Sequence, residues 1–426
     1  MRERAISPED LSRIKRWLAE AVVQSGLDYR NDLMTTEALL SDFRYKAGVP
    51  ALAVKEIWKN FLGIKEFRRK PLTLYMHFPY CRSRCLYCFM SSQQSRQSQE
   101  FRSYAEESGQ DEVDFYAPLF EGRFFDLWRV GGGTPSIMDA QDLRAWLEPA
   151  SRRFSFKKDA LRSIEFNPAS TDLKKVDLVK SLGFNRISFG VQTLNMDVLR
   201  AVNRGYQDEM MVRRSLAWAR EVGFPLINTD LIFGLVGESV MSFLDSFRRV
   251  AEMRPTSICV YSPPELSQTY LRAIKMGADE YLRYYEALLP ELEDKLPRLA
   301  KQTGYRVVDF LHGRTWGFVS PEHSMSNDEH WGDASDRGSI LGLGWHSRSH
   351  IFGRALYTRL AVPFGAAQPQ YLCAILTTKE EMCRRIIRQL QRYSRLDYAG
   401  FRGMFGRDIR EAFALEIGIL RAAGMI

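Results

Sequence analysis

Histidine and cysteine are scarce in this chain of 426 residues, which contains six of each. Six cysteines are too few to cross-link a protein of this length, so a disulfide-stabilised secreted scaffold is excluded. No apolar run is long enough to span a membrane, and the amino-terminal sequence MRERAISPED lacks the apolar core of a signal peptide. We therefore expect a cytoplasmic protein without membrane insertion, in which the cysteines remain thiols.

An excess of charge of one sign is also missing. The chain has 60 lysines and arginines against 52 aspartates and glutamates, which gives a net charge of +8. The basic residues are spread along the chain, so we expect a small-molecule substrate rather than a nucleic-acid partner. The hydrophobic content of 45% is that of an ordinary globular protein, and the length predicts about two to three domains.

Three cysteines stand close together in the segment YMHFPYCRSRCLYCFM. Cys81, Cys85 and Cys88 have the spacing CxxxCxxC, which lets one tight loop present three thiolates to a [4Fe-4S] cluster. No fourth cysteine is near, so one iron keeps an open coordination position, as a catalytic metal site requires. The remaining cysteines are widely separated, at Cys259, Cys373 and Cys383. We therefore expect one cluster and no second one.

Two other metal or redox sites could use the same residues. A structural zinc site would take His77 as its fourth ligand, because Cys3His is a common zinc ligand set. His77 falls within an expected strand, however, where its side chain more readily packs or forms a hydrogen bond. A redox-active CxxC pair of Cys85 and Cys88 would leave Cys81 without a role. The cluster site is the favoured interpretation.

Strand-like and helical segments alternate downstream of this loop, which predicts a parallel sheet or barrel. Six strand-like segments are expected, at residues 72–78, 124–132, 163–167, 186–192, 226–235 and 257–262. The stretches at 139–154 and 209–224 have apolar residues at helical spacing, and the Gly-Phe pairs at 183 and 223 stand where helices should end. The fold class is thus α/β, an open partial (β/α)6 barrel resembling a TIM barrel, with the chemistry at the carboxyl ends of the strands.

The regions outside the barrel predict a further division of the chain. Residues 1–70 form an expected amino-terminal helical segment, beginning after a cap at Ser7. Residues 71–265 form the barrel, and residues 266–355 a mixed extension that completes the barrel and its substrate side. Residues 356–426 are expected to form a mostly helical carboxyl-terminal domain.

The cysteine motif resembles that of the radical S-adenosylmethionine (SAM) enzymes, which have an aromatic residue before the third cysteine, here Tyr87. This resemblance implies a cluster whose open iron binds SAM and reduces its sulfonium, which produces a 5′-deoxyadenosyl radical. An electron donor such as flavodoxin or ferredoxin is implied as well. The resemblance also assigns SAM-binding positions along the strands, to Tyr75, Tyr87, Gly132, Gly133, Thr134, Glu165, Gln192, Arg204 and Asp230.

Each assigned residue type suits a part of SAM. Arg204 can pair with its carboxylate, Glu165 with its ammonium, and Gln192 and Asp230 with its ribose hydroxyls. The glycines of GGGTP allow the backbone to approach a ligand closely. Tyr75 is expected to serve the reaction itself together with the cluster cysteines, as well as binding the cofactor.

Longer segments resemble one branch of this family, which includes oxygen-independent coproporphyrinogen III dehydrogenase and its haem-chaperone relatives. The matching segments are FPYC, GVQTLN, VNRGY, DLIFGL, SNDEHW and ILGLGWHS. Some members of the branch hold two SAM molecules and make methyl transfers or cyclopropane rings, so one or two SAM molecules are expected. The chain departs from the branch at Val236, where proline is expected, at Phe89 after the third cysteine, and in its shorter carboxyl terminus.

These departures favour transfer of a methyl or methylene carbon from a second SAM to an unsaturated carbon of a natural product. Coproporphyrinogen dehydrogenase-like or haem-modifying chemistry is the first alternative. A haem chaperone without radical catalysis is the second, and it would draw on the histidines between 312 and 350 as ligands.

Overall fold

The computed structural model describes residues 47–65, 70–88, 90–262, 268–311, 315–323, 338–393 and 396–422. The chain divides into two compact units, one of residues 44–378 and one that includes residues 379–426. The amino-terminal helical segment, with its cap at Ser7, lies largely outside the described residues. Its described part begins with β1 (Ala47–Val49) and α3 (Ala51–Gly63).

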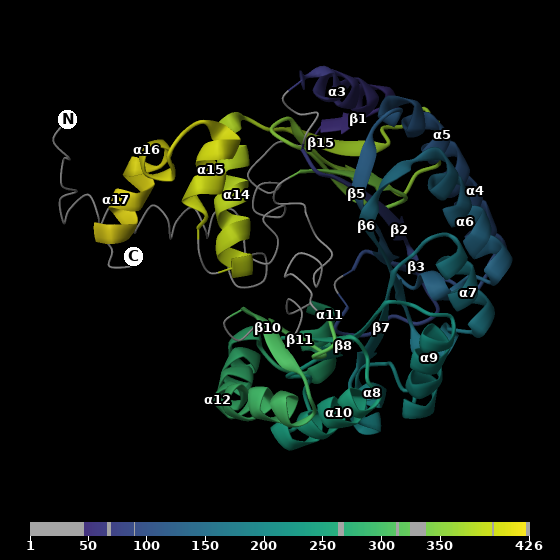
Figure 1. The fold of residues 1–426 in the computed structure, drawn as a ribbon, viewed down its shortest axis with the longest axis vertical. Helices are drawn as coiled ribbons and strands as arrows, with labels where there is room; N and C mark the ends of the chain where they lie inside the picture. The colour runs from purple at the N-terminus through teal and green to yellow at the C-terminus, as the bar shows by residue number, and fades with distance from the viewer. Residues whose placement is uncertain are drawn as a thin grey trace. The chain divides into compact units, whose positions relative to one another are not determined.

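In the described residues, the first unit contains one sheet of 13 strands and a separate two-stranded sheet (Figure 1). Its centre consists of six parallel strands in sequence order, β2 (Leu72–Phe78), β5 (Phe124–Gly132), β6 (Ser155–Phe166), β7 (Arg186–Gln192), β8 (Leu226–Ile232) and β9 (Ser257–Tyr261). These are the six strands predicted from the sequence, and they confirm the partial barrel. The main difference is the early start of β6, eight residues before the predicted strand.

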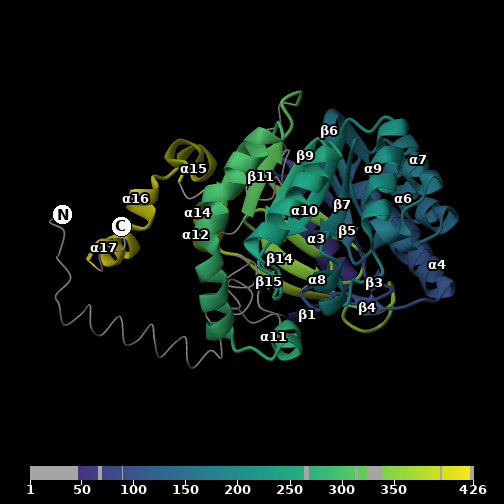
Figure 2. The same ribbon diagram turned by 90° about the horizontal axis from the view of Figure 1, so that it is seen from below.

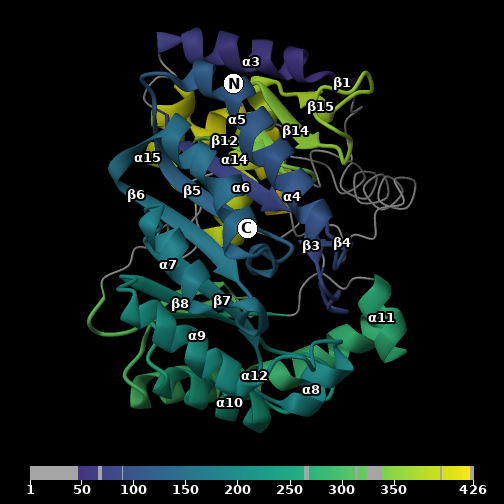
Figure 3. The ribbon, with the colours of Figure 1, turned by 90° about the vertical axis from the view of Figure 1, so that its right-hand side faces the viewer.

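Helices connect the parallel strands, as the apolar spacing predicted. The connections contain α4 (Ser98–Glu106), α5 (Glu112–Tyr116), α6 (Ala140–Arg153), α7 (Leu173–Ser181), α8 (Met196–Ala201), α9 (Glu209–Glu221) and α10 (Val240–Glu252). Figures 2 and 3 show α6, α7 and α9 together over one face of the sheet. Aspartate side chains cap α6, α7 and α9 by accepting a backbone N–H of the first turn. Gly183 and Gly223 follow α7 and α9 with φ of +89° and +79°, which a residue with a Cβ rarely adopts.

Strands from the later part of the chain extend both edges of this parallel core. Beside β9 lie β11 (Thr315–Val319) and β10 (Arg306–Leu311), which follow α11 (Gln268–Ile274) and α12 (Ala278–Gln302). Beside β2 lies β12 (Ser339–Leu343), parallel to it, followed outward by β13 (Arg348–Ile351), β14 (Ala355–Arg359), β15 (Tyr371–Ile375) and β1. The sheet therefore grows on both sides beyond the six predicted units.

The carboxyl-terminal helical region begins at α14 (Thr378–Tyr393), whereas the sequence placed its start at 356. Residues 355–375 belong to the sheet instead, because β14 and β15 pair with each other and with β13 and β1. The helices that follow are α15 (Tyr398–Phe405), α16 (Ile409–Ala412) and α17 (Ala414–Ala422). They share a core of Met382, Phe401, Ile409 and Phe413. In the described part of the chain, no helix is long and apolar enough to cross a membrane.

Candidate active site

The parallel strands separate apolar from polar side chains on their two faces. Trp128 and Val130 are fully buried on either side of Arg129 in β5, and Ile164 is fully buried next to Glu165 in β6. Because successive side chains of a strand alternate, Arg129 and Glu165 point to the opposite face, which is the lumen of the barrel. The interior of a complete barrel is normally filled with branched apolar residues. This lumen instead presents polar groups to a ligand.

The cysteine loop begins at the carboxyl end of β2. Cys81 lies in the short strand β3 (Tyr80–Cys81), which pairs with β4 (Gln93–Gln94), and its carbonyl accepts a hydrogen bond from the Ser95 amide at 3.0 Å. On the other side, the Leu86 amide donates to the Val202 carbonyl at 3.1 Å. The Asn203 side chain donates to the Arg84 carbonyl at 2.9 Å. The loop is thus fixed by backbone contacts with segments on both sides.

The three thiols of the loop differ in their electrostatic surroundings. Burial raises the pKa of Cys81, and burial raises the pKa of Cys88 to about 11. Burial would also raise the pKa of Cys85, but the Arg204 guanidinium outweighs it and lowers that pKa. The charge of Cys85 raises the pKa of Cys81, and the charges of Cys85 and Cys81 raise that of Cys88. All six cysteines of the chain are thiols.

Arg204 joins the loop to the barrel wall. Its Nη1 lies 3.4 Å from the Cys85 Sγ and 3.4 Å from the Tyr87 hydroxyl, and its Nη2 donates to the Gly190 carbonyl at 2.5 Å. Although burial opposes its charge, the facing Tyr87 and Cys85 hold the pKa of Arg204 above the usual value. Its Nε is buried and has no hydrogen-bond partner. The buried guanidinium lies beside a thiol and keeps one N–H donor unsatisfied. Both features fit a site for an anionic cluster.

A single zinc ion does not fit this loop. Among the described residues, no three His, Cys, Asp or Glu side chains converge closely enough to hold one metal ion. His77, the expected fourth ligand, already uses both ring nitrogens: Nδ1 contacts the Tyr75 hydroxyl at 2.8 Å and Nε2 contacts the Ser91 carbonyl at 2.9 Å. A [4Fe-4S] cluster takes each thiolate to a different iron, so it does not need sulfurs that meet at one point. The donor set therefore fits the cluster.

The glycine run at the end of β5 packs against the cysteine loop. The Gly133 amide donates to the Phe78 carbonyl at 2.6 Å, and the Thr134 amide donates to the Tyr80 carbonyl at 2.8 Å. A Cβ on Gly133 would collide with that Tyr80 carbonyl, and Gly132 has a φ of +106°. The Thr134 hydroxyl lies 3.3 Å from the Cys81 sulfur. These glycines are thus required by the close approach of two backbone segments, a reason the sequence did not indicate.

The other expected SAM-binding residues lie on successive strands of the lumen. Glu165 pairs with Arg129 at 3.0 Å. Asp230 on β8 accepts hydrogen bonds from Ser188 at 2.6 Å and from Asn228 at 2.8 Å, and burial raises its pKa. Gln192 ends β7 at an irregularity in the pairing with β8, with a left-handed φ of +71°. Such a conformation is costly outside glycine and is typical of functional sites.

Two tyrosines complete the set. The Tyr75 hydroxyl bonds His77, and burial raises its pKa far above the usual value. Tyr87 is buried, and its hydroxyl faces Arg204. The structure thus places Tyr87 on the loop's inner side, against the cation.

Several residues at this site were missed by the sequence analysis. The Tyr206 hydroxyl lies 3.9 Å from the Cys85 sulfur and 3.3 Å from the Asn167 amide nitrogen. Tyr206 closes the NRGY motif, which was the available signal. Arg129 carried no signal, because it belongs to none of the motifs that the sequence displays.

Of the five histidines between 312 and 350, the structure describes His323, His346 and His350, and the His323 Nδ1 lies 2.9 Å from the Ser320 hydroxyl. His312 and His330 lie outside the described residues. His346 follows β12 with a φ of +66°, and its ring centre lies 6.4 Å from that of His77. Burial lowers the pKa of both rings, that of His77 to about 4. His350 is buried, and its Nδ1 contacts the Gly338 carbonyl at 3.1 Å.

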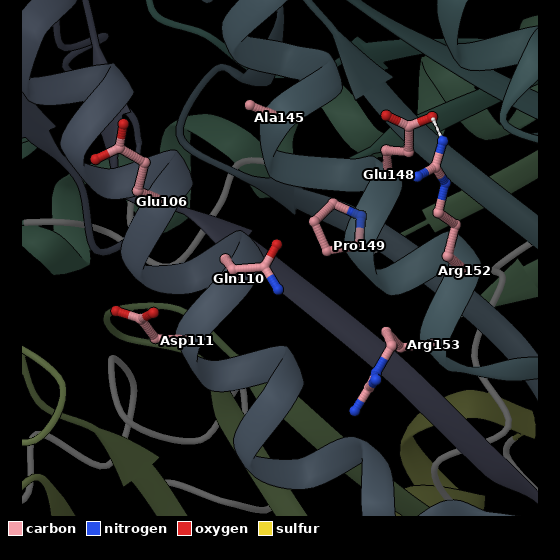
Figure 4. Close-up of a pocket in the computed structure, with 8 residues that line it drawn as sticks. All are labelled: Glu106, Gln110, Asp111, Ala145, Glu148, Pro149, Arg152 and Arg153. Atoms are coloured by element: carbon pink, nitrogen blue, oxygen red, sulfur yellow. Dashed lines mark hydrogen bonds and ion pairs between the residues drawn. The ribbon is translucent and has the colours of Figure 1, made fainter.

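A surface pocket of about 530 Å³ lies away from this site (Figure 4). It is formed by the outer side of α6 and by the π-helical turn η2 (Glu107–Asp111) with the end of α4. Its charged lining is partly paired, since Arg152 donates to Glu148 at 2.8 Å. None of the expected site residues lines it.

Comparison with known proteins finds a family model that matches part of the chain. Residues 75–250 match the model described as the radical SAM superfamily. This family uses a [4Fe-4S] cluster and SAM, which confirms both expected cofactors. An oxygen-independent coproporphyrinogen III oxidase of Escherichia coli (strain K12) is 32% identical over 270 residues, which cover 62% of this chain and 56% of the relative. The heme chaperone HemW of Haemophilus influenzae is 28% identical over 205 residues, or 45% of this chain and 50% of that protein.

The fold has a solved counterpart. The structure of coproporphyrinogen III oxidase (HemN) from Escherichia coli, a radical SAM enzyme, superposes with a TM-score of 0.72 over 91% of each chain, at 24% identity. This likeness confirms the partial barrel with its helical carboxyl-terminal part. In sequence, the match to the curated Escherichia coli oxidase spans less than two thirds of that relative's length.

The expected methyl or methylene transfer is wrong. Curated relatives that are 31–32% identical to this chain are named coproporphyrinogen III oxidases, so the porphyrinogen alternative fits better. The departure at Val236 has a local structural explanation: its amide donates to the Tyr270 hydroxyl at 2.8 Å, and Gly237 turns the chain with a φ of +91° to bury Glu238. It therefore does not indicate a different reaction. Residues 75–250 thus match the radical SAM superfamily, and the chain resembles oxygen-independent coproporphyrinogen III oxidases over part of their length.

Proposed function

We propose that this protein is a radical SAM oxidoreductase that acts on a carboxylate-bearing tetrapyrrole of the coproporphyrinogen class. The observation that carries the proposal is the loop of three cysteines beside the buried Arg204, at the mouth of a polar lumen, in a chain related to coproporphyrinogen III oxidases. The bound cofactors supply reductive cleavage of SAM and a 5′-deoxyadenosyl radical that abstracts hydrogen. The substrate reaction would be oxidative decarboxylation of a propionate side chain, which would lose one hydrogen atom to the radical, CO2, and one electron to a one-electron acceptor, and would become a vinyl group.

The residues of the chain would hold these cofactors as follows. Cys81, Cys85 and Cys88 would bind three irons, and Arg204 would offset part of the negative charge of the thiolates. The backbone of Gly132 and Gly133 with Thr134 would contact the methionyl part of SAM. Because the Thr134 hydroxyl already lies beside Cys81, the cluster site and the SAM site would be contiguous.

The lumen would hold the remainder of SAM. Glu165 would accept the ammonium group, and Asp230 and Gln192 would contact the ribose. Asp230 is suited to this role because Ser188 and Asn228 hold both of its oxygens in place. Tyr75, oriented by its hydrogen bond to His77, would contact SAM beside the cluster, and Tyr87 would support the site through Arg204.

The test is anaerobic reconstitution followed by incubation with coproporphyrinogen III, SAM and a reductant. About four irons per chain and a broad absorbance near 400 nm are expected for the cluster. Formation of 5′-deoxyadenosine together with a decarboxylated product would support the proposal. A Cys85→Ala variant that still cleaves SAM would contradict it. Haem binding without release of 5′-deoxyadenosine would favour a haem chaperone, and opening of a haem ring would favour the haem-modifying alternative.

An acidic electron carrier such as flavodoxin or ferredoxin would reduce the cluster from the outer side of the cysteine loop. Arg82 and Arg84 are exposed there, between the first two cysteines, and complementary charge accelerates association of such partners. In an Arg82→Glu/Arg84→Glu variant, SAM cleavage driven by flavodoxin should fall several-fold relative to cleavage driven by dithionite. Arg153→Glu/Lys158→Glu, with the same charge change near the amino end of β6, is the matched control.

A further inference from the structure

The Cys85 sulfur is surrounded by side-chain hydrogen-bond donors. The Arg204 Nη1 lies 3.4 Å from it, the Tyr206 hydroxyl lies 3.9 Å from it, and the Tyr87 hydroxyl hydrogen-bonds it as well. The Cys88 sulfur, by contrast, is hydrogen-bonded by a backbone group. A thiolate that ligates a metal has no proton to donate, so Arg204 and the two hydroxyls can only donate to Cys85 when it holds an iron.

The Asn167 side chain decides where the Tyr206 hydroxyl directs its hydrogen. The Asn167 Oδ1 accepts the Ala169 backbone N–H at 2.9 Å, which fixes the orientation of the amide. The Nδ2 therefore faces the Tyr206 hydroxyl, at 3.3 Å, and an amide nitrogen can only donate. Because the hydroxyl oxygen receives that hydrogen bond, its own hydrogen is directed to the Cys85 sulfur.

Asn167 is held in place by the chain segments around it. It follows β6 and is only 7% exposed. Its backbone N–H donates to the Ser136 hydroxyl at 3.0 Å, and its carbonyl accepts a hydrogen bond from the Thr171 hydroxyl at 2.8 Å. Tyr206 is 42% exposed, so burial alone would not fix its side chain. The rigid amide of Asn167 supplies the missing constraint.

We propose that Tyr206, oriented by Asn167, donates a hydrogen bond to the Cys85 thiolate and thereby raises the reduction potential of the [4Fe-4S] cluster. Hydrogen bonds to ligand sulfurs stabilise the more negative, reduced cluster and so tune its potential. The step concerned is the gain of one electron by the cluster, from the 2+ to the 1+ state, in which no bond forms or breaks. Tyr206 is a positioning residue, because it acts on the cluster through Cys85. The inference rests on the part of the proposed function that assigns the cluster to the three cysteines, and it holds for any substrate.

The experiment is a reductive titration of the cluster-loaded protein without SAM. Dithionite supplies the electron, redox mediators are present, and EPR spectroscopy measures the reduced cluster. Tyr206→Phe keeps the ring beside Arg204 and removes the hydroxyl alone. It should lower the equilibrium constant for reduction by about three- to tenfold, as expected for one hydrogen bond, which shifts the potential by up to about 59 mV to more negative values. Tyr398→Phe removes the hydroxyl of a tyrosine of similar exposure in α15 and should leave the potential unchanged.

Asn167→Asp tests the orienting role of the amide. One carboxylate oxygen can still accept the Ala169 N–H, but the other would accept the Tyr206 hydrogen and turn it away from Cys85. Tyr206→Phe should therefore leave the potential of Asn167→Asp unchanged, although it lowers that of the unaltered protein. Equal lowering in both backgrounds would overturn the inference.

Iron content and potential together separate the possible failures. If the unaltered protein takes up no cluster, the proposed function fails and the inference with it. If it holds about four irons per chain and Tyr206→Phe has the same potential or a higher one, the inference alone fails. Tyr206→Phe should also keep its iron, and a loss of iron would show that Tyr206 only supports the loop, which would overturn the inference as well.

Discussion

Glu238 makes the folding stability of this protein depend on pH in an unusual direction. Its side chain is 1% exposed, one carboxylate oxygen accepts a hydrogen bond from the Thr193 hydroxyl, and the other oxygen is buried without a hydrogen-bond partner. Burial raises its pKa from 4.5 to about 8, so the folded protein holds this carboxyl neutral at pH 7.

The magnitude follows from this difference in pKa. Between pH 4.5 and 8 the unfolded chain has released the proton and the folded chain has kept it, so each pH unit in this window lowers the stability by about 1.4 kcal/mol. The total loss is ~5 kcal/mol by pH 8 and does not grow above it. Glu238→Gln keeps an acceptor for Thr193 and removes the titration. We expect the variant to match the unaltered protein near pH 4.5 and to exceed its stability by several kcal/mol at pH 8.

The assay is urea unfolding of the cluster-loaded protein under anaerobic conditions at several pH values from 5 to 8.5. The free energy of unfolding of the unaltered protein should decline relative to that of Glu238→Gln as pH rises, with the steepest change below pH 8. Glu121→Gln, which alters an exposed carboxylate, should run parallel to the unaltered protein. Parallel curves for Glu238→Gln as well would refute the reasoning, since they would mean that this carboxyl ionises equally in both states.

Three further changes test the site and the sheet. Gly133→Ala should displace the cysteine loop and reduce the iron content to well below four per chain. The control is Gly63→Ala, whose added Cβ meets no atom within 4 Å and should leave the iron content unchanged. Full iron content in Gly133→Ala would contradict the packing argument. Arg359→Met should lower the free energy of unfolding by about 3–5 kcal/mol in denaturant titrations, because it strands two acidic partners, one of them fully buried; a loss below about 1 kcal/mol would contradict this. Cys259→Ala and Cys383→Ala should each keep about four irons per chain in iron analysis, and a lower value would reveal a ligand outside the loop.

Local patterns were sufficient to predict the core of the fold. The six parallel strands and the helices between them follow from apolar periodicity and from capping residues a few positions away, such as Asp139 before α6. The position of Gly183 after α7 is equally local. Each of these features depends on residues within one or two turns of chain, and the sequence displays such spacings directly.

The edges of the sheet depended on distant pairings. β12 lies parallel to β2, with Ser339 opposite Leu72, and this contact joins segments separated by most of the barrel. Residues 356–377 were therefore assigned to a helical region, although they contain four of the five residues of β14 and all of β15. A short apolar segment is compatible with a helix or a strand, and its neighbours in space decide which of the two forms.

The sequence by itself determined the cluster motif, because the spacing of Cys81, Cys85 and Cys88 within one loop is a property of eight consecutive residues. Only the tertiary structure decided what surrounds that motif. It brought Arg204 to Cys85 across 119 positions and Arg129 to Glu165 across 36. The charge that a thiol or a carboxylate experiences depends on distance in space, and a linear sequence does not record that distance until the strands are ordered in a sheet.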